Sequence, residues 1–263
     1  VAKLYTDAFK LHLERAKELD YSGLMWDSEA VRQLLQALRS NTALQSLNLG
    51  DNHVGLEGAV ALGEALRNNT SLVLLELPNS NIGPKGVAAL GEALQNNRSL
   101  QTLNLYKNKV GSEGAASLGE ALQSNSSLQE LNLRRNRVGK EGAVALGEAL
   151  RSNRSLQTLQ LYGNNVGPQG AAALAEALRS NVSLQCLRLG ENEIGAEGAA
   201  AFGEALRDNA SLIRLDLRGN DIGSEAAIRL QEALRSNDTL REVDLRDNNI
   251  CVEADPAQAR FLF

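Results

Sequence analysis

A twelve-residue segment, LQELNLRRNRVG at residues 128–139, recurs along this chain every 28 residues. Steps of 28 from its first leucine reach a leucine every time, with no insertion or deletion: Leu44, Leu72, Leu100, Leu128, Leu156, Leu184, Leu212 and Leu240. A unit this small cannot bury its own apolar face and must stack on copies of itself. The period therefore predicts one elongated domain with a continuous core, although 263 residues would be enough for two ordinary domains.

Each unit has two halves with different periodicities. In the first half Leu131 and Leu133 alternate with polar residues, as on a strand with one buried face. In the second half Ala143, Leu146 and Leu150 fall on one face of a helix. A short strand followed by a helix within 28 residues is typical of a leucine-rich repeat.

Stacking such units predicts a curved α/β solenoid. Parallel strands lie about 4.8 Å apart, whereas packed helices need about 8–10 Å. We therefore expect a horseshoe with a parallel inner β-sheet and outer helices. The leucines of each strand should point into the core, and the residues between them should face the hollow.

The repeat divides the chain into three parts. Residues 44–239 hold seven full repeats, preceded at 1–43 by an N-terminal helix around Lys3 to Leu19 and a degenerate capping repeat. Residues 240–263 form a half repeat and a cap, in which the tail after Cys251 either folds back over the last repeat or marks a truncation. The N-terminal part is rich in aromatic residues, which suits a cap over the open end of the core: Tyr5, Phe9, Tyr21 and Trp26.

Two asparagine columns have structural explanations. The column containing Asn136 should lie inside the turn after each strand and bind backbone groups there, and Ser80, which replaces it in one repeat, should bind fewer. The column containing Asn125 should close each helix in a left-handed conformation. A Ser or Thr two residues later then produces the Asn-x-Ser/Thr pattern through the repeat itself, so we do not interpret it as glycosylation.

The sequence contains no constellation for catalysis or for a metal. His12 and His53 lie far apart, the cysteines lack ligand spacing, and no phosphate-binding or nucleophile motif is present. We therefore expect no enzymatic activity, no cofactor and no metal. Cys186 and Cys251 are more than two repeats apart, too far for a disulfide, so we expect free thiols and a cytoplasmic location.

Composition also limits the partners. A net charge of −5 argues against nucleic acid and anionic membranes, both of which need a basic face. No apolar run is long enough to span a bilayer. We expect a monomer that binds another protein.

The strand positions facing the hollow vary between repeats, and we place the binding site there. One column carries Tyr106, Arg134 and Tyr162 on successive strands. Tyrosine and arginine are frequent anchors of protein interfaces. The predicted partner-binding set adds the basic residues around these anchors and two polar residues on the same strands: Lys107, Lys109, Arg135, Arg137, Glu130 and Gln160.

Over about residues 16 to 250 the repeat LxxLxLxxNxVGxxGAxALGEALRxN resembles the ribonuclease-inhibitor-like leucine-rich repeats. Runs such as LYGNNVG at 161–167 are most similar to the C-terminal repeats of NOD-like receptors. The resemblance implies the ligand-sensing or autoinhibitory region of an intracellular innate immune receptor. It departs from ribonuclease inhibitor in its uniform period and few cysteines, and from a whole NOD-like receptor in having no nucleotide-binding domain.

Two other interpretations remain open. The repeats are also similar to those of Ran GTPase-activating proteins, which would make the chain a regulator of a GTPase. No arginine of this sequence can be matched to a catalytic role in that family, and the family's acidic tail is absent. A consensus-like engineered scaffold is the third interpretation, because the register is unbroken.

Overall fold

The computed structural model describes residues 13, 15–251 and 261–263. The described part contains a ten-stranded parallel sheet in which the strands follow the order of the sequence. The strands are β1 (Glu18–Asp20), β2 (Ser46–Asn48), β3 (Leu74–Glu76), β4 (Thr102–Asn104), β5 (Glu130–Asn132), β6 (Thr158–Gln160), β7 (Cys186–Arg188), β8 (Arg214–Asp216), β9 (Glu242–Asp244) and β10 (Phe261–Leu262).

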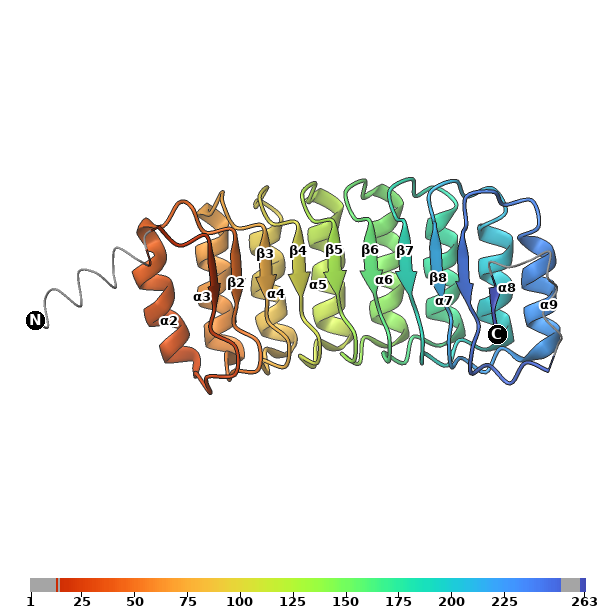
Figure 1. The fold of residues 1–263 in the computed structure, drawn as a ribbon, viewed down its shortest axis with the longest axis horizontal. Coiled ribbons are helices and arrows are strands. Elements are labelled where there is room, and N and C mark those ends of the chain that lie inside the picture. The colour runs from red at the N-terminus through yellow and green to blue at the C-terminus, as the bar shows by residue number, and fades with distance from the viewer. Residues whose placement is uncertain (1–12, 14, 252–260) are drawn as a thin grey trace, which may run out of the picture.

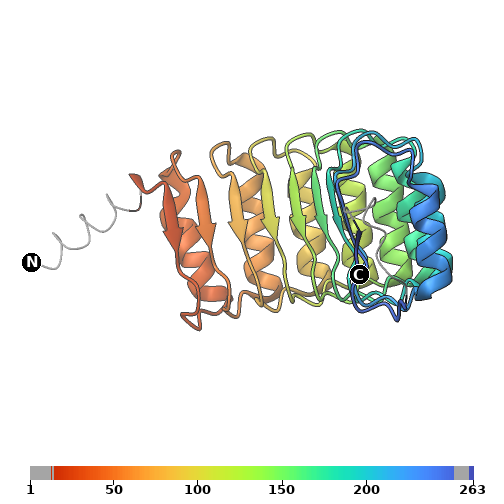
Figure 2. The same ribbon diagram turned by 45° about the vertical axis from the view of Figure 1, so that its right-hand side comes forward.

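Helices connect the successive strands from β1 to β9. They are α2 (Ser28–Ala37), followed by the short 3₁₀ helix η1 (Leu38–Ser40), then α3 (Gly55–Asn68), α4 (Gly83–Leu94), α5 (Gly111–Ser124), α6 (Gly139–Ser152), α7 (Gly167–Leu178), α8 (Gly195–Ala205) and α9 (Gly223–Ala233). The strands run along one face of the stack and the helices along the other (Figures 1 and 2). The predicted α/β solenoid is confirmed.

The 28-residue period is the register of the sheet. Leu103 on β4 pairs with Leu131 on β5, and Leu131 pairs with Leu159 on β6. These leucines are at most 1% exposed, whereas the strand residues on either side of Leu131 are half-buried and face outward. We call this outward side of the strands the sheet face.

Glycines in the middle of the helices allow adjacent helices to lie close together. A Cβ atom on Gly119 would lie 2.9 Å from the carbonyl oxygen of Ala145 in the next helix, and one on Gly63 would lie 2.7 Å from that of Ala89. Close helix contact therefore accounts for these glycines. Ala175 holds the same position in α7 and is buried, so one methyl group fits there.

The asparagine column of the turns forms a ladder through the stack. Asn136 Nδ2 donates to the carbonyl oxygens of Leu105 at 2.8 Å and Arg134 at 3.1 Å, and its Oδ1 accepts the backbone N–H groups of Asn108 and Val110. Each asparagine therefore joins its own turn to the preceding repeat, as the sequence predicts.

Ser80 is the weak position of this ladder. Its hydroxyl donates to the carbonyl oxygens of Leu49 and Pro78. Within the described part of the chain it accepts no backbone N–H group, whereas Asn136 accepts two. The shorter side chain thus satisfies fewer groups, as expected.

The second asparagine column forms another ladder, and the conformation predicted for it is wrong. Asn69, Asn125 and Asn153 have φ of −83°, −75° and −66° and an extended backbone, not a left-handed one. Asn125 Nδ2 donates to the carbonyl oxygens of Leu94 and Asn97 in the preceding repeat, and its Oδ1 accepts two N–H groups of its own loop. These bonds to the neighbouring repeat select the backbone conformation. Asn125 is 4% exposed, so the Asn-x-Ser/Thr pattern here marks an inward-facing amide.

The two ends of the sheet carry extra strands. Leu19 lies in β1 and pairs with Leu47, so the helix predicted to reach Leu19 is wrong at that end, because Leu19 occupies a core position of the sheet. The remainder of that predicted helix, with Tyr5 and Phe9, is outside the described residues apart from its last turn. At the other end, β10 adds beside β9 and buries the ring of Phe261.

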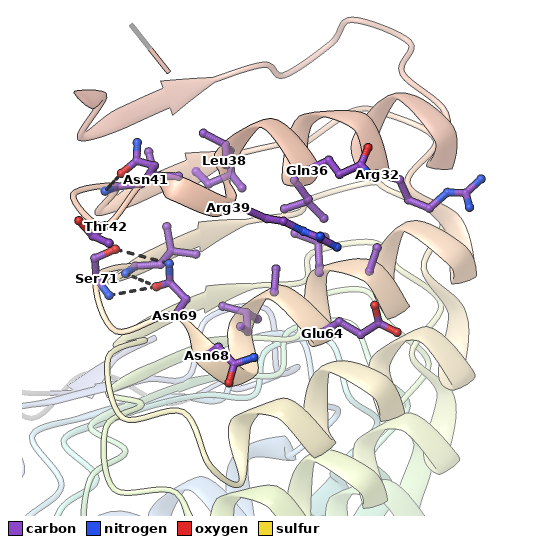
Figure 3. Close-up of a pocket in the computed structure, with 18 of the residues that line it drawn as sticks. Arg32, Gln36, Leu38, Arg39, Asn41, Thr42, Glu64, Asn68, Asn69 and Ser71 are labelled. Carbon is purple, nitrogen blue, oxygen red and sulfur yellow. Dashed lines mark hydrogen bonds between the residues drawn. The ribbon is translucent and has the colours of Figure 1, made fainter. Parts of the chain in front are cut away.

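One helix pair packs differently from the others. Helices α2 and α3 flank a cleft of about 780 Å³, into which Arg39 extends (Figure 3). Leu35 lines this cleft and lies 28 residues before Gly63, so it occupies the position that is glycine in α3. Since even a Cβ atom at Gly63 would meet a backbone oxygen at 2.7 Å, a leucine there requires wider helix spacing. Leu35 explains why α2 stands away from α3.

Connections present in other repeats are missing across this cleft. Asn97 Nδ2 donates to two carbonyl oxygens of the preceding repeat, whereas within the described chain Asn69 Nδ2 donates to Ser71 Oγ of its own loop. Arg67 pairs with Glu92 across the next helix interface at 2.8 Å. Their counterparts one repeat earlier, on opposite sides of the cleft, form no ion pair among the described residues: Arg39 and Glu64. The N-terminal repeat is therefore held through the sheet and through the turn ladder at Asn52.

Candidate functional site

Tyr106, Arg134 and Tyr162 lie side by side on the sheet face. Each follows the end of its strand by two residues, and the strands β4, β5 and β6 are paired in register. The guanidinium carbon of Arg134 is 5.0 Å from the ring centroid of Tyr162 and 6.0 Å from that of Tyr106. An arginine at these distances is attracted to both aromatic faces. We call these three residues the Tyr–Arg–Tyr cluster.

The four basic residues predicted beside the cluster surround it on the turn side. Lys107 Nζ is 5.2 Å from the Tyr106 ring centroid, and the guanidinium carbon of Arg135 is 6.0 Å from that of Tyr162. Lys109 and Arg137 lie two residues further along the same turns and are also exposed. Lys109 Nζ donates to Asn81 Oδ1 at 3.1 Å. Among the described residues, none of the four forms an ion pair with a carboxylate, so their charge is available.

Glu130 and Gln160 lie on β5 and β6 and bind each other. Gln160 Nε2 donates to Glu130 Oε1 at 2.8 Å. Both side chains are half-buried. Part of their hydrogen-bonding capacity is thus used within the sheet face, and Glu130 places one negative charge next to the cluster.

Tyr162 marks the boundary with an acidic region of the sheet face, which contains Glu191, Glu193, Asp216 and Asp221. Its ring covers Gly190, where an added Cβ atom would lie 2.8 Å from the ring. A hydrogen bond to Glu191 raises the pKa of Tyr162, and burial raises it further. Gly190 and Glu191 were not predicted to be site residues. The sequence feature that could have predicted this contact is a glycine in the repeat after Tyr162, at the same position of the repeat. Only a residue without a side chain leaves room there for the tyrosine ring.

Arg134 differs from the two other arginines of its column. Arg218 donates from Nε and Nη2 to the two oxygens of Asp216, both at 3.1 Å. Arg246 makes the same fork with Asp244, at 2.9 and 2.6 Å. Two residues before Arg134 stands Asn132, which has no second carboxylate oxygen. The Nε atom of Arg134 is buried and has no hydrogen-bond partner among the described residues, so its guanidinium keeps an uncompensated charge within this part of the chain.

The remaining features of the described chain concern metal ligands, membrane spans and thiols. Within residues 15–251 and the other described positions, no group of three His, Cys, Asp or Glu side chains could hold a metal ion. No helix of this part is long and apolar enough to cross a membrane. Cys186 is half-buried and Cys251 is exposed, and both are free thiols.

The family of the chain follows from its repeats. The sequence matches the leucine-rich repeat family at residues 40–63, 96–119, 124–147, 152–175, 180–203, 208–230 and 236–250, which together cover more than half of the chain. It is a leucine-rich repeat protein. The unmatched stretch between residues 63 and 96 contains Pro78 and Ser80, which depart from the repeat pattern. No curated protein sequence matches this leucine-rich repeat protein.

Solved structures resemble the fold. A chain in the crystal structure of the yeast Rad7 and Elc1 complex aligns with a TM-score of 0.62 and 16% identity, over 91% of this chain and 65% of that one. The tropomodulin C-terminal domain of Caenorhabditis elegans aligns with a TM-score of 0.49 and 23% identity, over 57% and 92% of the two chains. Leiomodin-1 Actin-Binding Site 2 gives 0.44 and 21%, over 48% and 75%. At these identities the likeness to Rad7 and Elc1 shows the fold.

Proposed function

We propose that this leucine-rich repeat protein is a non-enzymatic protein-binding module that uses its sheet face. The observation that carries the proposal is the Tyr–Arg–Tyr cluster, in which Arg134 lies between two tyrosine rings without a carboxylate partner. Buried tyrosines and arginines at the centre of an interface contribute most of its binding energy. The cluster offers one charged donor and two rigid amphipathic rings on a surface that no other part of the described chain covers.

Electrostatics would assist the encounter. The basic residues beside the cluster are exposed, and the acidic region begins one strand beyond Tyr162. A partner with an acidic surface would be steered toward the basic side, and this contribution falls with salt, since exposed charges are screened within about 8 Å at physiological ionic strength.

The resemblance of the repeats to those of NOD-like receptors supports a more specific proposal. The module would be the ligand-sensing or autoinhibitory region of an intracellular innate immune receptor, acting as a monomer in the cytoplasm. The two free thiols are compatible with a reducing compartment.

The test compares two triple variants. One replaces the Tyr–Arg–Tyr cluster by alanine, and the other replaces Glu64, Glu92 and Glu120 on the helical side. Proteins captured from cytosol by the unmodified chain are identified by mass spectrometry, and the affinity of each is measured by calorimetry with the purified partner. We expect the cluster variant to weaken binding by about 2 kcal/mol or more, with unchanged circular dichroism, and the helical variant to bind normally.

The opposite pattern, with binding lost only in the helical variant, would place the interface on the other side of the solenoid. A GTP hydrolysis assay with a panel of small GTPases tests the regulator alternative directly. Stimulated hydrolysis would overturn the proposal that the module acts by binding alone.

A further inference from the structure

Three arginines of one column provide an internal comparison on the sheet face. Arg218 and Arg246 are each neutralised by the aspartate two residues earlier. Arg134 has an asparagine at that position. The backbone relation is the same in both cases: Asn132 Oδ1 accepts the N–H of Arg134 at 3.1 Å, and Asp216 Oδ1 accepts the N–H of Arg218 at 3.1 Å.

One atom of the residue two positions earlier distinguishes the paired from the unpaired arginines, and Arg218 has a further carboxylate neighbour in Asp244, at 3.2 Å. Aspartate supplies a second oxygen that accepts Nη2 of the arginine, whereas asparagine supplies an amide nitrogen that can only donate. Arg134 consequently turns to the tyrosine rings, and its guanidinium forms no ion pair in the described chain. A planar guanidinium in this state matches a carboxylate, which it binds through two parallel N–H donors.

We infer that Arg134 is the specificity-determining residue of the sheet face, binding an aspartate or glutamate side chain of an extended acidic segment of the partner, and that Asn132 keeps it available. This inference rests on the proposed function and names the chemistry of the partner at that site. The geometry of the bond is already present in the chain, where Arg218 and Arg246 hold carboxylates as two-donor forks.

The charges around the cluster favour a polypeptide over a polyphosphate. Glu130 lies four residues before Arg134 on the same strand segment, and Glu191 interacts with Tyr162. A nucleic-acid backbone crossing the cluster would bring its phosphates toward both carboxylates. A polypeptide can place single carboxylates at Arg134 and at the turn side, where Lys107 and Arg135 stand, and neutral or basic residues next to Glu191.

The decisive variant is Asn132→Asp, which removes none of the proposed binding groups. It should supply the missing oxygen, so that Arg134 donates two hydrogen bonds to the new carboxylate, as Arg218 does to Asp216. Asn48→Asp is the matched control, because Asn48 holds the same column and bonds to the N–H of the residue two positions later, which is Gly50 rather than an arginine. Both variants add one negative charge to the sheet face.

The first measurement is structural. In ¹⁵N NMR spectra of the arginine Nε–H groups, Asn132→Asp should move the Arg134 signal toward those of Arg218 and Arg246, and Asn48→Asp should leave it in place. An unmoved Arg134 signal in Asn132→Asp would overturn the role assigned to Asn132.

The second measurement is binding of a fluorescent peptide of alternating glutamate and serine. About 12 residues suffice, because an extended chain spans about 3.3 Å per residue and so crosses the basic strands. We expect the unmodified chain and Asn48→Asp to bind this peptide, and Asn132→Asp to bind it about tenfold more weakly or worse, as expected when a charged hydrogen bond is lost. A twin peptide with glutamine in place of glutamate should bind as weakly as the glutamate peptide binds to Asn132→Asp.

Three outcomes would overturn the inference. In the first, the glutamate peptide fails to bind, and in the second, its glutamine twin binds equally well. In the third, inorganic phosphate shifts the Arg134 signal as much as the peptide does and displaces the peptide. Native-partner binding separates the two proposals. In one result, the alanine variant of the Tyr–Arg–Tyr cluster loses the partner while Asn132→Asp still binds it, with Arg134 paired to the new carboxylate. In that case the sheet face binds its partner without a carboxylate at Arg134. If the alanine variant keeps the partner, the proposed function itself fails.

Discussion

The Nδ2 amide of Asn136 donates to the carbonyl oxygen of Leu105, 31 residues earlier in the chain, at 2.8 Å. This bond crosses from one repeat to the preceding one in a region where both residues are fully buried. An unsatisfied buried polar group costs about 1–3 kcal/mol. The side chain of Asn136 therefore acts as a structural connection within the core.

Replacing Asn136 by alanine should lower the stability of the chain by at least about 1–3 kcal/mol, because carbonyl and N–H groups of two turns lose their partner. Arg137→Ala, at the exposed neighbouring position, should be nearly silent for folding. Thermal unfolding followed by circular dichroism measures both variants. Equal melting temperatures would show that the asparagine ladder does not stabilise the stack.

The close approach of α5 and α6 predicts a size limit at Gly119. Leucine at this position should lower stability by about 1–3 kcal/mol, because the side chain must displace the carbonyl oxygen of Ala145. Gly119→Ala should be close to neutral, since a helix-propensity gain of about 1 kcal/mol opposes the tight contact. Urea unfolding of both variants tests the limit. Similar losses for alanine and leucine would show that side-chain size is not what matters there.

The cleft beside Leu35 predicts that the N-terminal repeat opens independently. Backbone amides of α2 should exchange with deuterium faster than those of α5, because fewer connections join α2 to its neighbour. Leu35→Ala should let α2 approach α3 and allow the side chain of Asn69 to reach the carbonyl oxygen of Leu38. Slower exchange of α2 in this variant is the expected result, and unchanged exchange would mean that Leu35 does not hold the cleft open.

The hydrogen bond between Tyr162 and Glu191 predicts a titration effect. The bond favours the protonated phenol, so it raises the pKa of Tyr162 above its ordinary value of 10.0. The resulting stabilisation is present below pH 10 and is lost as the pH rises through the folded-state pKa. Glu191→Gln should lower the pKa of Tyr162. Glu193→Gln should have little effect, because Glu193 does not contribute to the shift in the pKa of Tyr162. Site-resolved ¹³C NMR of the tyrosine rings during a pH titration measures both.

Much of the fold could be predicted because the sequence repeats its own geometry. The constant step between Leu103 and Leu131 is the register of the sheet, and the column containing Asn136 is a hydrogen-bond ladder. The same register places Tyr106, Arg134 and Tyr162 on adjacent strands, so their proximity could be predicted without coordinates.

Other features depend on contacts that local sequence does not specify. An asparagine after a helix is compatible with a left-handed or an extended backbone, and Asn125 is extended because its amide binds carbonyl groups of the preceding repeat. The short strand β10 depends on the exposed edge of β9 rather than on a pattern of its own. The absence of a carboxylate partner for Arg134 within the described chain could also have been predicted from the sequence, although it was not. The pairs Asp216 with Arg218 and Asn132 with Arg134 differ at one position, and that difference decides which guanidinium is free of a carboxylate.

The two asparagine ladders also bear on how the length of such a chain can change in evolution. From Asn108 to Asn220, each asparagine of the turns donates its side-chain amide to the repeat before it and its backbone N–H to the side-chain oxygen of the next asparagine, through the same atoms in every repeat. A genetic duplication or deletion of 28 residues within this range would bring together two surfaces that already fit. Insertions of any other length would break both ladders at once. Recombination between copies can therefore lengthen or shorten the central array without new compensating mutations, while both terminal repeats stay in place.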